Sequence, residues 1–537
     1  MSAYKDQTST RCLGACIVAA VGLLIASSGA SAAGRFGNAS GTLVVNAAGA
    51  PSTLDPANIS ELPDCVLLNL YSSLVTFGTK PGPSGSTVTN YAKILPALAR
   101  SWKVSPDGRT YTFVLRPNLK FANGDPLDAG AVKFSFDRTL KMNISSAFNV
   151  YNGDPGNAPV AKVLNPTTVV LRVKHADPGL ISAWAFVPVV DPKVVDAHGG
   201  VVADKPNVYM ATHDAGAGPY MLSSYQPNIR LTMVANPYYY GTPPASKRVI
   251  VNFISSESTL LLQAQNSTAD ITYGLSKQSI QSLRSDKSVT VISAPTPDTE
   301  QVILPWKKYP FQNIKVREAL AYAVPYHQLL SRVAYGIGRT FYGPIPPAMP
   351  YYNAALSKPL QTSLTRAKQL LQGSGVKLPL HIQLTIDAGN TVHQQLATVL
   401  QAEWKPLGVD LSVRQLSAAA YTNVLFGNKA QAVLRRDGPL VPDPAYYLGY
   451  DLACKLQGTE NTGQICIPGV DNLLTKARKA NGAARGRLYA EVTRLWRDAY
   501  PKIFLYEDDL AIVVSKKVSH FQFDRLESGF RSATTTG

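Results

Sequence analysis

The sequence predicts a mixed α/β protein built from at least two domains. A chain of 537 residues is too long to fold around a single hydrophobic core. Segments with the two-residue alternation typical of strands are interspersed with segments of helical spacing along the whole chain. No internal repeat and no low-complexity linker separates them. We therefore expect domains that are joined without a flexible tether.

Most of the predicted strands lie in the first half of the chain. The alternating segments are residues 42–46, 102–116, 169–173 and 229–233. The second of these is expected to be a hairpin, because Ser105-Pro106-Asp107-Gly108 is a turn sequence. Asp128 is an expected N-cap for a helix that places Val132, Phe136 and Leu140 on one side.

Three helices are predicted in the second half of the chain. The helical segments are residues 316–323, 364–372 and 392–404. The first of these must break near Pro325, where a second helix can restart because proline is tolerated at a first helical position. Gly373 is expected to end the second segment.

The charge of the chain gives little support for a nucleic-acid or membrane partner. Hydrophobic residues make up 45% and charged residues 16%, which is typical of a folded globular protein. The formal net charge is +17, but the lysines and arginines are spread along the chain. Their longest clusters are pairs such as Lys307-Lys308, Arg435-Arg436 and Lys516-Lys517. Scattered charge of this kind indicates a solvated surface.

The first 32 residues have the pattern of a cleaved signal peptide. Lys5 and Arg11 precede an apolar stretch at residues 16–26, and Ala30-x-Ala32 follows as a cleavage site. The apolar stretch is too short for a permanent membrane span. A lipoprotein-like segment at residues 13–16 lies before the apolar stretch, where lipidation would not use it. We expect an exported, periplasmic protein.

Two cysteines are expected to form a disulfide in that compartment. Cys454 and Cys466 bracket eleven residues with the glycine and asparagine content of a surface loop. No histidine lies near them, which disfavours a metal site.

The sequence contains none of the common motifs of catalysis or cofactor binding. His-Glu-x-x-His, Gly-x-Ser-x-Gly and the phosphate-binding Gly-x-x-x-x-Gly-Lys are all missing from it. No cofactor is therefore expected. A glycosidase-type hydrolase stays open as an alternative, because two catalytic carboxylates need no recognisable spacing.

Several blocks of the chain resemble the extracellular solute-binding proteins of family 5, the peptide-, nickel- and oligosaccharide-binding components of ABC importers. The blocks are Leu54-Asp55-Pro56, Leu95-Pro96-Ala97-Leu98-Ala99-Arg100-Ser101-Trp102, Lys120-Phe121-x-Asn123-Gly124-Asp125-Pro126-Leu127, Gly216-Ala217-Gly218-Pro219-Tyr220, and the segments 310–323 and 404–409. In this order they extend over nearly the whole chain after the signal peptide.

The resemblance implies a two-lobed periplasmic binding protein-like fold of type II, cluster C. The first lobe would comprise residues 40–297 together with 502–537, and the second lobe residues 298–501. A small molecule would bind in the cleft between the lobes, which close about hinge strands. The partners would be a membrane permease and its ATPase subunits, and the protein itself would be a monomer that catalyses no reaction.

The segment from residue 435 to 444 departs from the peptide-binding members of that family. Those relatives usually carry a Trp, and then an Asp three residues before an Asp/Glu-Pro pair; that first Asp receives the ammonium group of the peptide. Asp443-Pro444 matches the closing pair, but Leu440 stands three residues earlier, and Asp437 occupies the place of the Trp. Either Asp437 still receives an ammonium group, or the ligand is not a simple zwitterionic peptide.

A second departure concerns the carboxylate end of a bound peptide. Dipeptide-binding relatives place an Arg where this chain has Asp387, and an Asp would repel a carboxylate. Asp387 and Asp437 facing one cleft would favour a cationic or amine-bearing ligand. The other reading makes both of them solvated loop acids.

Further candidates for the ligand site are aromatic. The residues that offer stacking surface are Tyr273, Trp306, Tyr309, Tyr421 and Tyr446, and Asp443 completes the set of expected ligand-binding residues. The seven histidines form no ligand-like cluster, so no metal is expected. Two other functions stay open, namely a secreted hydrolase on a binding-protein scaffold and a periplasmic chaperone or sensor.

Overall fold

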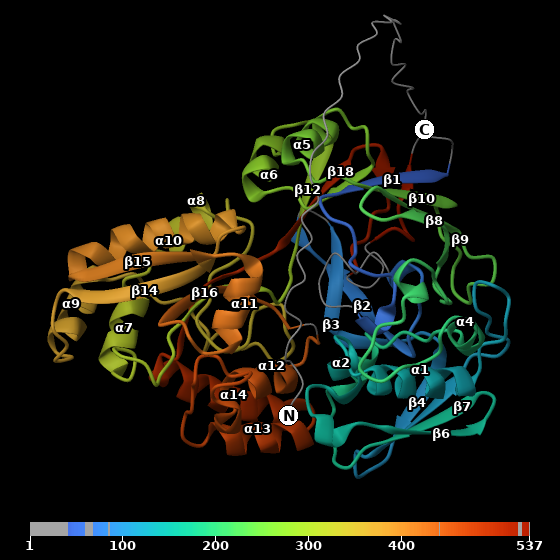
Figure 1. Ribbon diagram of the computed structural model, residues 1–537, viewed down its shortest axis with the longest axis horizontal. Helices are drawn as coiled ribbons and strands as arrows, with labels where there is room; N and C mark the ends of the chain where they lie inside the picture. Colours follow the sequence, from blue (N-terminus) through green and yellow to red (C-terminus); the bar gives the residue numbers. More distant parts are fainter. Residues whose placement is uncertain (1–40, 59–67, 84–85, 440, 525–528, 536–537) are drawn as a thin grey trace, which may run out of the picture. The chain divides into compact units, whose positions relative to one another are not determined.

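Two large β-sheets organise the computed structural model (Figure 1). The structure describes residues 41–58, 68–83, 86–439, 441–524 and 529–535. The predicted signal peptide and Leu440 lie outside the described residues. Ala39–Gly537 form one compact unit.

The first large sheet has seven strands in the order β12-β18-β11-β1-β10-β9-β8. Strand β1 runs parallel to its neighbours β10 and β11, and the remaining pairs of the sheet are antiparallel. The strands are β1 Thr42–Ala47, β8 Tyr220–Gln226, β9 Arg230–Ala235, β10 Arg248–Phe253, β11 Ile271–Tyr273, β12 Val289–Ala294 and β18 Leu510–Ser515.

Smaller sheets and helices complete this half of the chain. A four-stranded antiparallel sheet has the order β4-β5-β7-β6, and β2 pairs with β3. These strands are β2 Val75–Pro81, β3 Thr87–Pro96, β4 Ala99–Val104, β5 Thr110–Leu115, β6 Val160–Asn165 and β7 Thr168–Arg172. The helices are α1 Ala129–Met142, α2 Ala147–Tyr151, α3 Leu180–Trp184, α4 Pro192–Ala197, α5 Glu257–Gln265 and α6 Lys277–Leu283. Two short strands, β19 Val518–Ser519 and β20 Thr534–Thr535, pair near the end of the chain.

The second large sheet has five strands in the order β15-β14-β16-β13-β17. Its strands are β13 Thr299–Ile303, β14 Leu380–Asp387, β15 Val409–Leu416, β16 Ala432–Asp437 and β17 Lys502–Glu507. The helices of this half are α7 Ile314–Tyr322, α8 Tyr326–Arg332, α9 Leu364–Gln372, α10 Thr391–Trp404, α11 Ala418–Phe426, α12 Pro444–Leu452, α13 Val470–Lys479 and α14 Gly482–Ala499. Helix α10 packs against β14 and β15 (Figure 1).

The local predictions are confirmed. The hairpin of β4 and β5, the strands β1, β7 and β9, and the helices α7, α9 and α10 lie where the hydrophobic patterns predict them. Asp128 caps α1, and its side chain accepts hydrogen bonds from the backbone N–H groups of Gly130 and Ala131. We expect Pro325 at the first helical position of the restarted helix. In the structure it lies one position earlier, as the N-cap residue of α8.

The two largest hydrophobic cores of the described residues lie on either side of two chain crossings. The larger core contains residues between 43 and 294 and between 512 and 533, and a second core contains residues between 302 and 506. The chain passes from the seven-stranded to the five-stranded sheet between β12 and β13, and it returns between β17 and β18. We refer below to the first part and the second part of the chain on this basis.

A buried ion pair ties the opening segment to the first core. Both guanidinium nitrogens NH1 and NH2 of Arg138, on α1, donate to the carboxylate of Asp55, at 2.9 and 2.5 Å. The Asp55 side chain is 0% exposed and that of Arg138 is 1% exposed. Asp55 also accepts from the backbone N–H of Ala57. Each charge is thus matched where water cannot reach it.

We predict that Asp55→Asn lowers the free energy of unfolding by about 3–5 kcal/mol, because Arg138 would stay buried without a countercharge. Urea unfolding measures this change. A control is Asp137→Asn on the same helix, which removes an exposed pair with Lys133 and should cost about 1 kcal/mol or less. Equal losses in the two variants would contradict the prediction.

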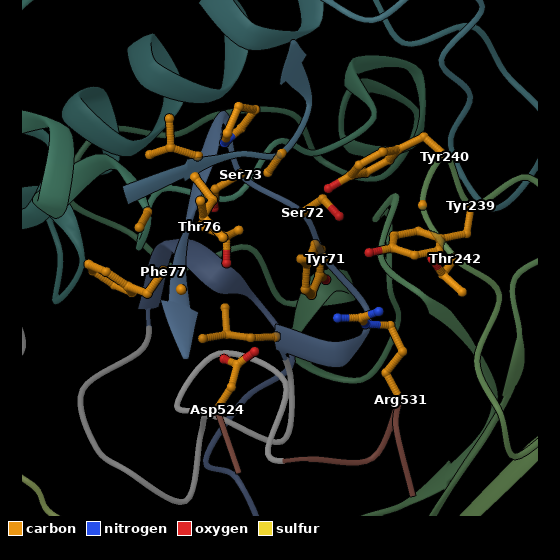
Figure 2. A pocket seen from close by; sticks show the side chains of 18 of the residues that line it. Tyr71, Ser72, Ser73, Thr76, Phe77, Tyr239, Tyr240, Thr242, Asp524 and Arg531 are labelled. Carbon is orange, nitrogen blue, oxygen red and sulfur yellow. The ribbon is translucent and has the colours of Figure 1, made fainter. Parts of the chain in front are cut away.

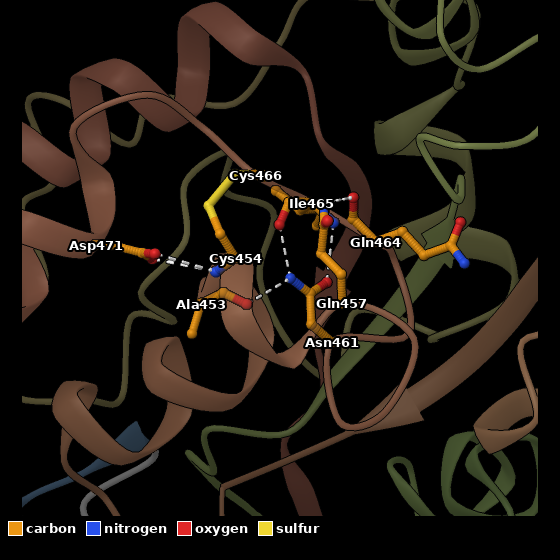
Figure 3. The surroundings of a disulfide bond; sticks show 8 residues. All are labelled: Ala453, Cys454, Gln457, Asn461, Gln464, Ile465, Cys466 and Asp471. Carbon is orange, nitrogen blue, oxygen red and sulfur yellow. Dashed lines mark hydrogen bonds between the residues drawn. A yellow bond between two sulfur atoms is a disulfide. The ribbon is translucent and has the colours of Figure 1, made fainter.

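A disulfide links Cys454 to Cys466, between the end of α12 and the start of α13 (Figure 3). Inside the loop, the Asn461 side chain donates to the carbonyls of Ala453 and Ile465 and accepts from the Ile465 N–H. The Cys454 N–H donates to the carboxylate of Asp471, on α13. The loop is therefore ordered by polar contacts as well as by the covalent bond.

Replacing both cysteines by alanine should lower the free energy of unfolding by about 3 kcal/mol, because the unfolded chain loses a closed loop with a sequence separation of 12. Unfolding of the wild type with and without a reductant gives an independent measurement. If the double variant and the oxidised wild type were equally stable, this prediction would fail.

Candidate functional site

The carboxyl ends of three parallel strands meet at one edge of the five-stranded sheet. Strand β14 runs parallel to β15 and to β16. Asp387 ends β14 opposite Leu416 of β15, and Asp437 ends β16. Ligands of open α/β sheets bind beyond this edge. Of the residues expected to bind a ligand, Asp387 and Asp437 are thus brought to the same edge.

The carboxylate of Asp437 already has partners within the chain. Its Oδ1 accepts from NH2 of Arg435 at 2.9 Å, and its Oδ2 accepts from Nε2 of Gln301 at 3.2 Å. The side chain is 16% exposed. An ammonium group that binds here would therefore share Asp437 with a guanidinium group.

Arg435 is the residue of this site that the sequence reasoning missed. It lies two residues before Asp437 on the same strand, so both side chains point to the same face of the sheet. Burial lowers the pKa of Arg435, but Asp437 and Asp451 raise it more, and the net pKa lies above its ordinary value. Arg435 is therefore a permanent cation. The alternation of side chains along a strand was the available signal.

Tyr421 joins this group from α11. Its hydroxyl donates to the carbonyl of Leu434 at 2.8 Å. Burial raises the pKa of this hydroxyl, Arg435 opposes that shift, and Glu300, Asp437 and Asp387 add to it. The hydroxyl is thus close enough to these four charged groups to be affected by them.

Tyr446, on α12, lies next to the same charges and also contacts the first part of the chain. Its ring stacks on Phe148 of α2 with 5.6 Å between the centroids. Burial raises the pKa of its hydroxyl, and Tyr450 and Asp437 contribute to the shift. Tyr446 is the expected aromatic residue that reaches both parts.

Asp443 is occupied by structural contacts. It caps α12 and accepts from the Ala445 N–H at 2.8 Å. Both of its carboxylate oxygens also accept from the guanidinium group of Arg485, each at 2.9 Å. The residue is 3% exposed. The sequence could not reveal this pairing, because Arg485 lies 42 residues further along the chain.

The remaining aromatic candidates lie elsewhere. Because β13 runs antiparallel to β16, Trp306 follows β13 at the opposite edge of the sheet, where the Arg317 guanidinium carbon lies 4.1 Å from its ring centroid. Tyr309 is 60% exposed. Tyr273 ends β11 in the seven-stranded sheet, with its ring 6.3 Å from that of Phe530. These three are not brought together with Asp387 and Asp437.

The two chain crossings carry a second group of charges. Arg436 donates to Asp298 at 2.8 Å, and the Asp508 N–H donates to the Asp298 carbonyl at 2.8 Å. Asp508 also pairs with Lys277 of α6. Carboxylates that follow β12 and β17 are thus neutralised by cations from both parts of the chain.

Three cavities lined by described residues bear on where a ligand could bind. One of about 320 Å³ is surrounded by side chains that include Tyr71, Tyr239, Tyr240 and Arg531 (Figure 2). A second, of about 950 Å³, is lined by residues that include Arg284 and Arg339, and a third measures about 470 Å³. None of these three is lined by any of the expected ligand-binding residues.

Two further features bear on the class of protein. Among the residues that the structure describes, no three His, Cys, Asp or Glu side chains are grouped in a way that could hold a metal ion. The described helices include none with the length and apolar character needed to cross a membrane.

Comparison with known proteins identifies the family. The family described as bacterial extracellular solute-binding proteins, family 5 middle, matches residues 93–458. This match covers more than half of the chain, and the chain therefore belongs to that family. The family prediction from the sequence is confirmed.

Individual relatives bind different ligands. A probable D,D-dipeptide-binding periplasmic protein of Escherichia coli strain K12 is 27% identical over 489 residues, which cover 90% of this chain and 91% of the relative. The nickel-binding periplasmic protein of the same strain is 28% identical over 344 residues, covering 60% and 63%.

A solved structure confirms the fold class. The ABC transporter-associated periplasmic binding protein of Helicobacter pylori, in complex with the peptide STSA, has a TM-score of 0.76 with this chain. The two are 20% identical, and the comparison covers 93% of this chain and 98% of that one. The chain thus has the α/β fold of a periplasmic binding protein.

The burial of Glu507, at the second crossing, predicts that stability depends on pH. Burial raises the pKa of its carboxyl from 4.5 to about 8, against the opposing effect of Arg339. The folded state then keeps a proton that the unfolded state loses near pH 4.5. Stability contributed by this group should fall as the pH rises from about 4.5 to about 8, and stay level above that.

The Glu507→Gln variant tests this dependence, because glutamine cannot titrate. The free energy of unfolding of the wild type, minus that of the variant, should decrease between pH 5 and pH 8. Denaturant unfolding at several pH values measures the difference. A difference that is constant over this range would show that Glu507 has no raised pKa.

Proposed function

We propose that this chain is the solute-binding component of an ABC importer, and that it captures a small organic solute bearing an amine group. The observation that carries the proposal is the meeting of Asp387, Asp437, Arg435 and Tyr421 at the carboxyl edge of the five-stranded sheet. Membership of the family supports the class of function. The captured solute would be passed to a membrane permease and its ATPase subunits, and the chain itself would catalyse no reaction.

Capture would proceed by closure of two lobes. Our expected lobes are residues 40–297 with 502–537, and residues 298–501. The two hydrophobic cores and the two crossings support this division. Strand β17 pairs with β13 in the five-stranded sheet, which favours a return crossing after Glu507 instead of before Lys502. A ligand that binds both lobes would shift the equilibrium toward the closed form.

Function outside the cytoplasmic membrane would follow from export. Residues 1–32 have the pattern of a signal peptide, and the relatives named above are periplasmic proteins. The Cys454–Cys466 disulfide is typical of an oxidising compartment.

The pairing of Arg435 with Asp437 refines the expected ligand. A compound with an amine alone would compete with Arg435 for the carboxylate of Asp437. A ligand that carries both an ammonium group and a carboxylate or carbonyl oxygen could engage Asp437 and Arg435 together. Oligopeptide-like compounds have both groups, and for this reason they are the favoured class.

The first experiment is a thermal-shift screen of dipeptides, polyamines and amino acids, because a bound ligand raises the apparent stability. Calorimetry then gives the affinity for the compound with the largest shift. Asp437→Asn should weaken this binding by about 1–3 kcal/mol, since a buried charged partner is left unmet. Asp410→Asn is the control, because Asp410 lies near the opposite end of β15, where it is exposed.

Unchanged affinity in Asp437→Asn would place the ligand elsewhere. The same compound should also reduce the radius of gyration measured by small-angle X-ray scattering. If no compound in the screen shifts stability or compacts the protein, lobe closure around an amine-bearing solute is refuted. Release of a chemically altered product would instead favour the hydrolase alternative.

A further inference from the structure

One charged contact joins the two parts of the chain away from the crossings. Guanidinium NH1 of Arg478, on α13 in the second part, donates to Oδ2 of Asp177 in the first part at 2.8 Å. The Asp177 side chain is 0% exposed and that of Arg478 is 17% exposed. The two residues are 301 positions apart in the sequence.

Each partner is held in place by its own part of the chain. Asp177 accepts from the Asn152 side chain and from the Gly179 N–H, both at 3.0 Å, and its carbonyl accepts from the Tyr111 hydroxyl. Arg478 donates through NH2 to the carbonyl of Ala445 at 2.7 Å. The carboxylate of Asp177 and the guanidinium group of Arg478 are therefore both held in position by their own part of the chain, and the ion pair is the contact that joins them.

The surfaces around this ion pair fit closely. A Cβ atom on Gly153 would lie 2.8 Å from the rings of Tyr446 and Tyr450, and one on Gly179 would lie 2.6 Å from the carboxylate carbon of Asp443. Glycine at both positions lets the backbone of the first part approach α12. The stacking of Phe148 on Tyr446 adds an aromatic contact to the same surface.

The charges of Asp177, Arg478, Asp443 and Arg485 balance only when the two parts are together. The second part contributes Arg478 and Arg485 against the single carboxylate of Asp443, an excess of one positive charge. The first part contributes Asp177, one negative charge. Both Asp443 and Arg485 act electrostatically on Asp177. Contact between the parts thus completes a group of two cations and two anions.

The contact is also suited to opening. A cavity of about 470 Å³ adjoins it, lined by residues that include Asp154, His175, Lys479 and Arg478 itself. Charged surfaces regain hydrogen bonds with water when they separate. Exposing apolar surfaces to water, by contrast, is unfavourable by the full hydrophobic free energy. An ion pair contributes little net stability but fixes one geometry of contact.

We propose that Asp177 and Arg478 form a closing latch, which holds the two lobes together around the bound solute and slows its release. The latch rests on the proposed function, because it presupposes lobes that open and close. Neither residue of the latch directly contacts Asp387 or Asp437 at the strand edge. Its expected effect is therefore on the lifetime of the complex more than on the choice of ligand.

The test uses Asp177→Asn, Arg478→Gln and the double variant in the full-length exported protein. The probe is the dipeptide, polyamine or amino acid that gives the largest thermal shift. Stopped-flow measurement should show its dissociation rate constant raised about tenfold in each single variant, because breaking one half of a buried charge pair acts mainly on dissociation. Arg494→Gln is the control, since it removes an exposed pair with Glu491 on α14.

The double variant shows whether the two residues act through one shared contact or independently of each other. If the two residues act as one contact, the double variant should release the probe no faster than the faster single variant. Multiplied effects, or wild-type dissociation in both single variants, would overturn the latch. Should Asp177→Asn fail to fold, Arg478→Gln alone decides, because Arg478 is partly exposed. If the probe compacts the wild type but dissociates from the variants at the wild-type rate, the latch is refuted and the proposed function still stands.

Discussion

The pairing of deeply buried carboxylates such as Asp55, Asp443 and Asp451 with cations is the constraint on which this structure depends. The chain has few charged residues for its length, and several of them are placed where water is excluded. Asp55 is matched by Arg138, Asp443 by Arg485, and Asp451 by Lys502. Because an unmatched buried charge costs several kcal/mol, each pair fixes the relative position of two segments that are far apart in the sequence.

This constraint also explains the character of the candidate site. At the strand edge, Asp437 is matched by Arg435 from its own strand, so the site presents both signs of charge within a few ångströms. Under the proposed function, such a site would bind simple cations weakly. It would select a molecule whose own charged groups can replace both partners of the pair, so the spacing of those groups would matter as much as the net charge.

Local structure was predictable because its causes are local. The alternation in β5 and β7, the turn at residues 105–108 and the cap at Asp128 each depend on residues within one element, and each is found as expected. The site was predictable only in part. That Asp387 and Asp437 share an edge depends on the register of β14 and β16, which no spacing in the sequence reveals.

The surroundings of two other expected ligand-binding residues also depend on distant parts of the chain. Asp443 matches a family motif, yet its partner Arg485 comes from another helix. Trp306 has a side chain suited to stacking, but the antiparallel direction of β13 carries it to the opposite edge of the sheet. Arg435 was visible in the sequence as half of a basic pair, and the alternation along β16 could have placed its side chain on the same face as Asp437, whereas the ion pair between them is seen only in the structure.

The disulfide has a mechanical consequence beyond its effect on stability. It ties the end of α12 to the start of α13, and these two helices carry Tyr446 and Arg478, the side chains that touch the first part of the chain. The covalent link limits how far the two helices can move relative to each other, and it therefore couples the contacts that Tyr446 and Arg478 make with the first part of the chain. Protein matured in a reducing cytoplasm would lack this coupling.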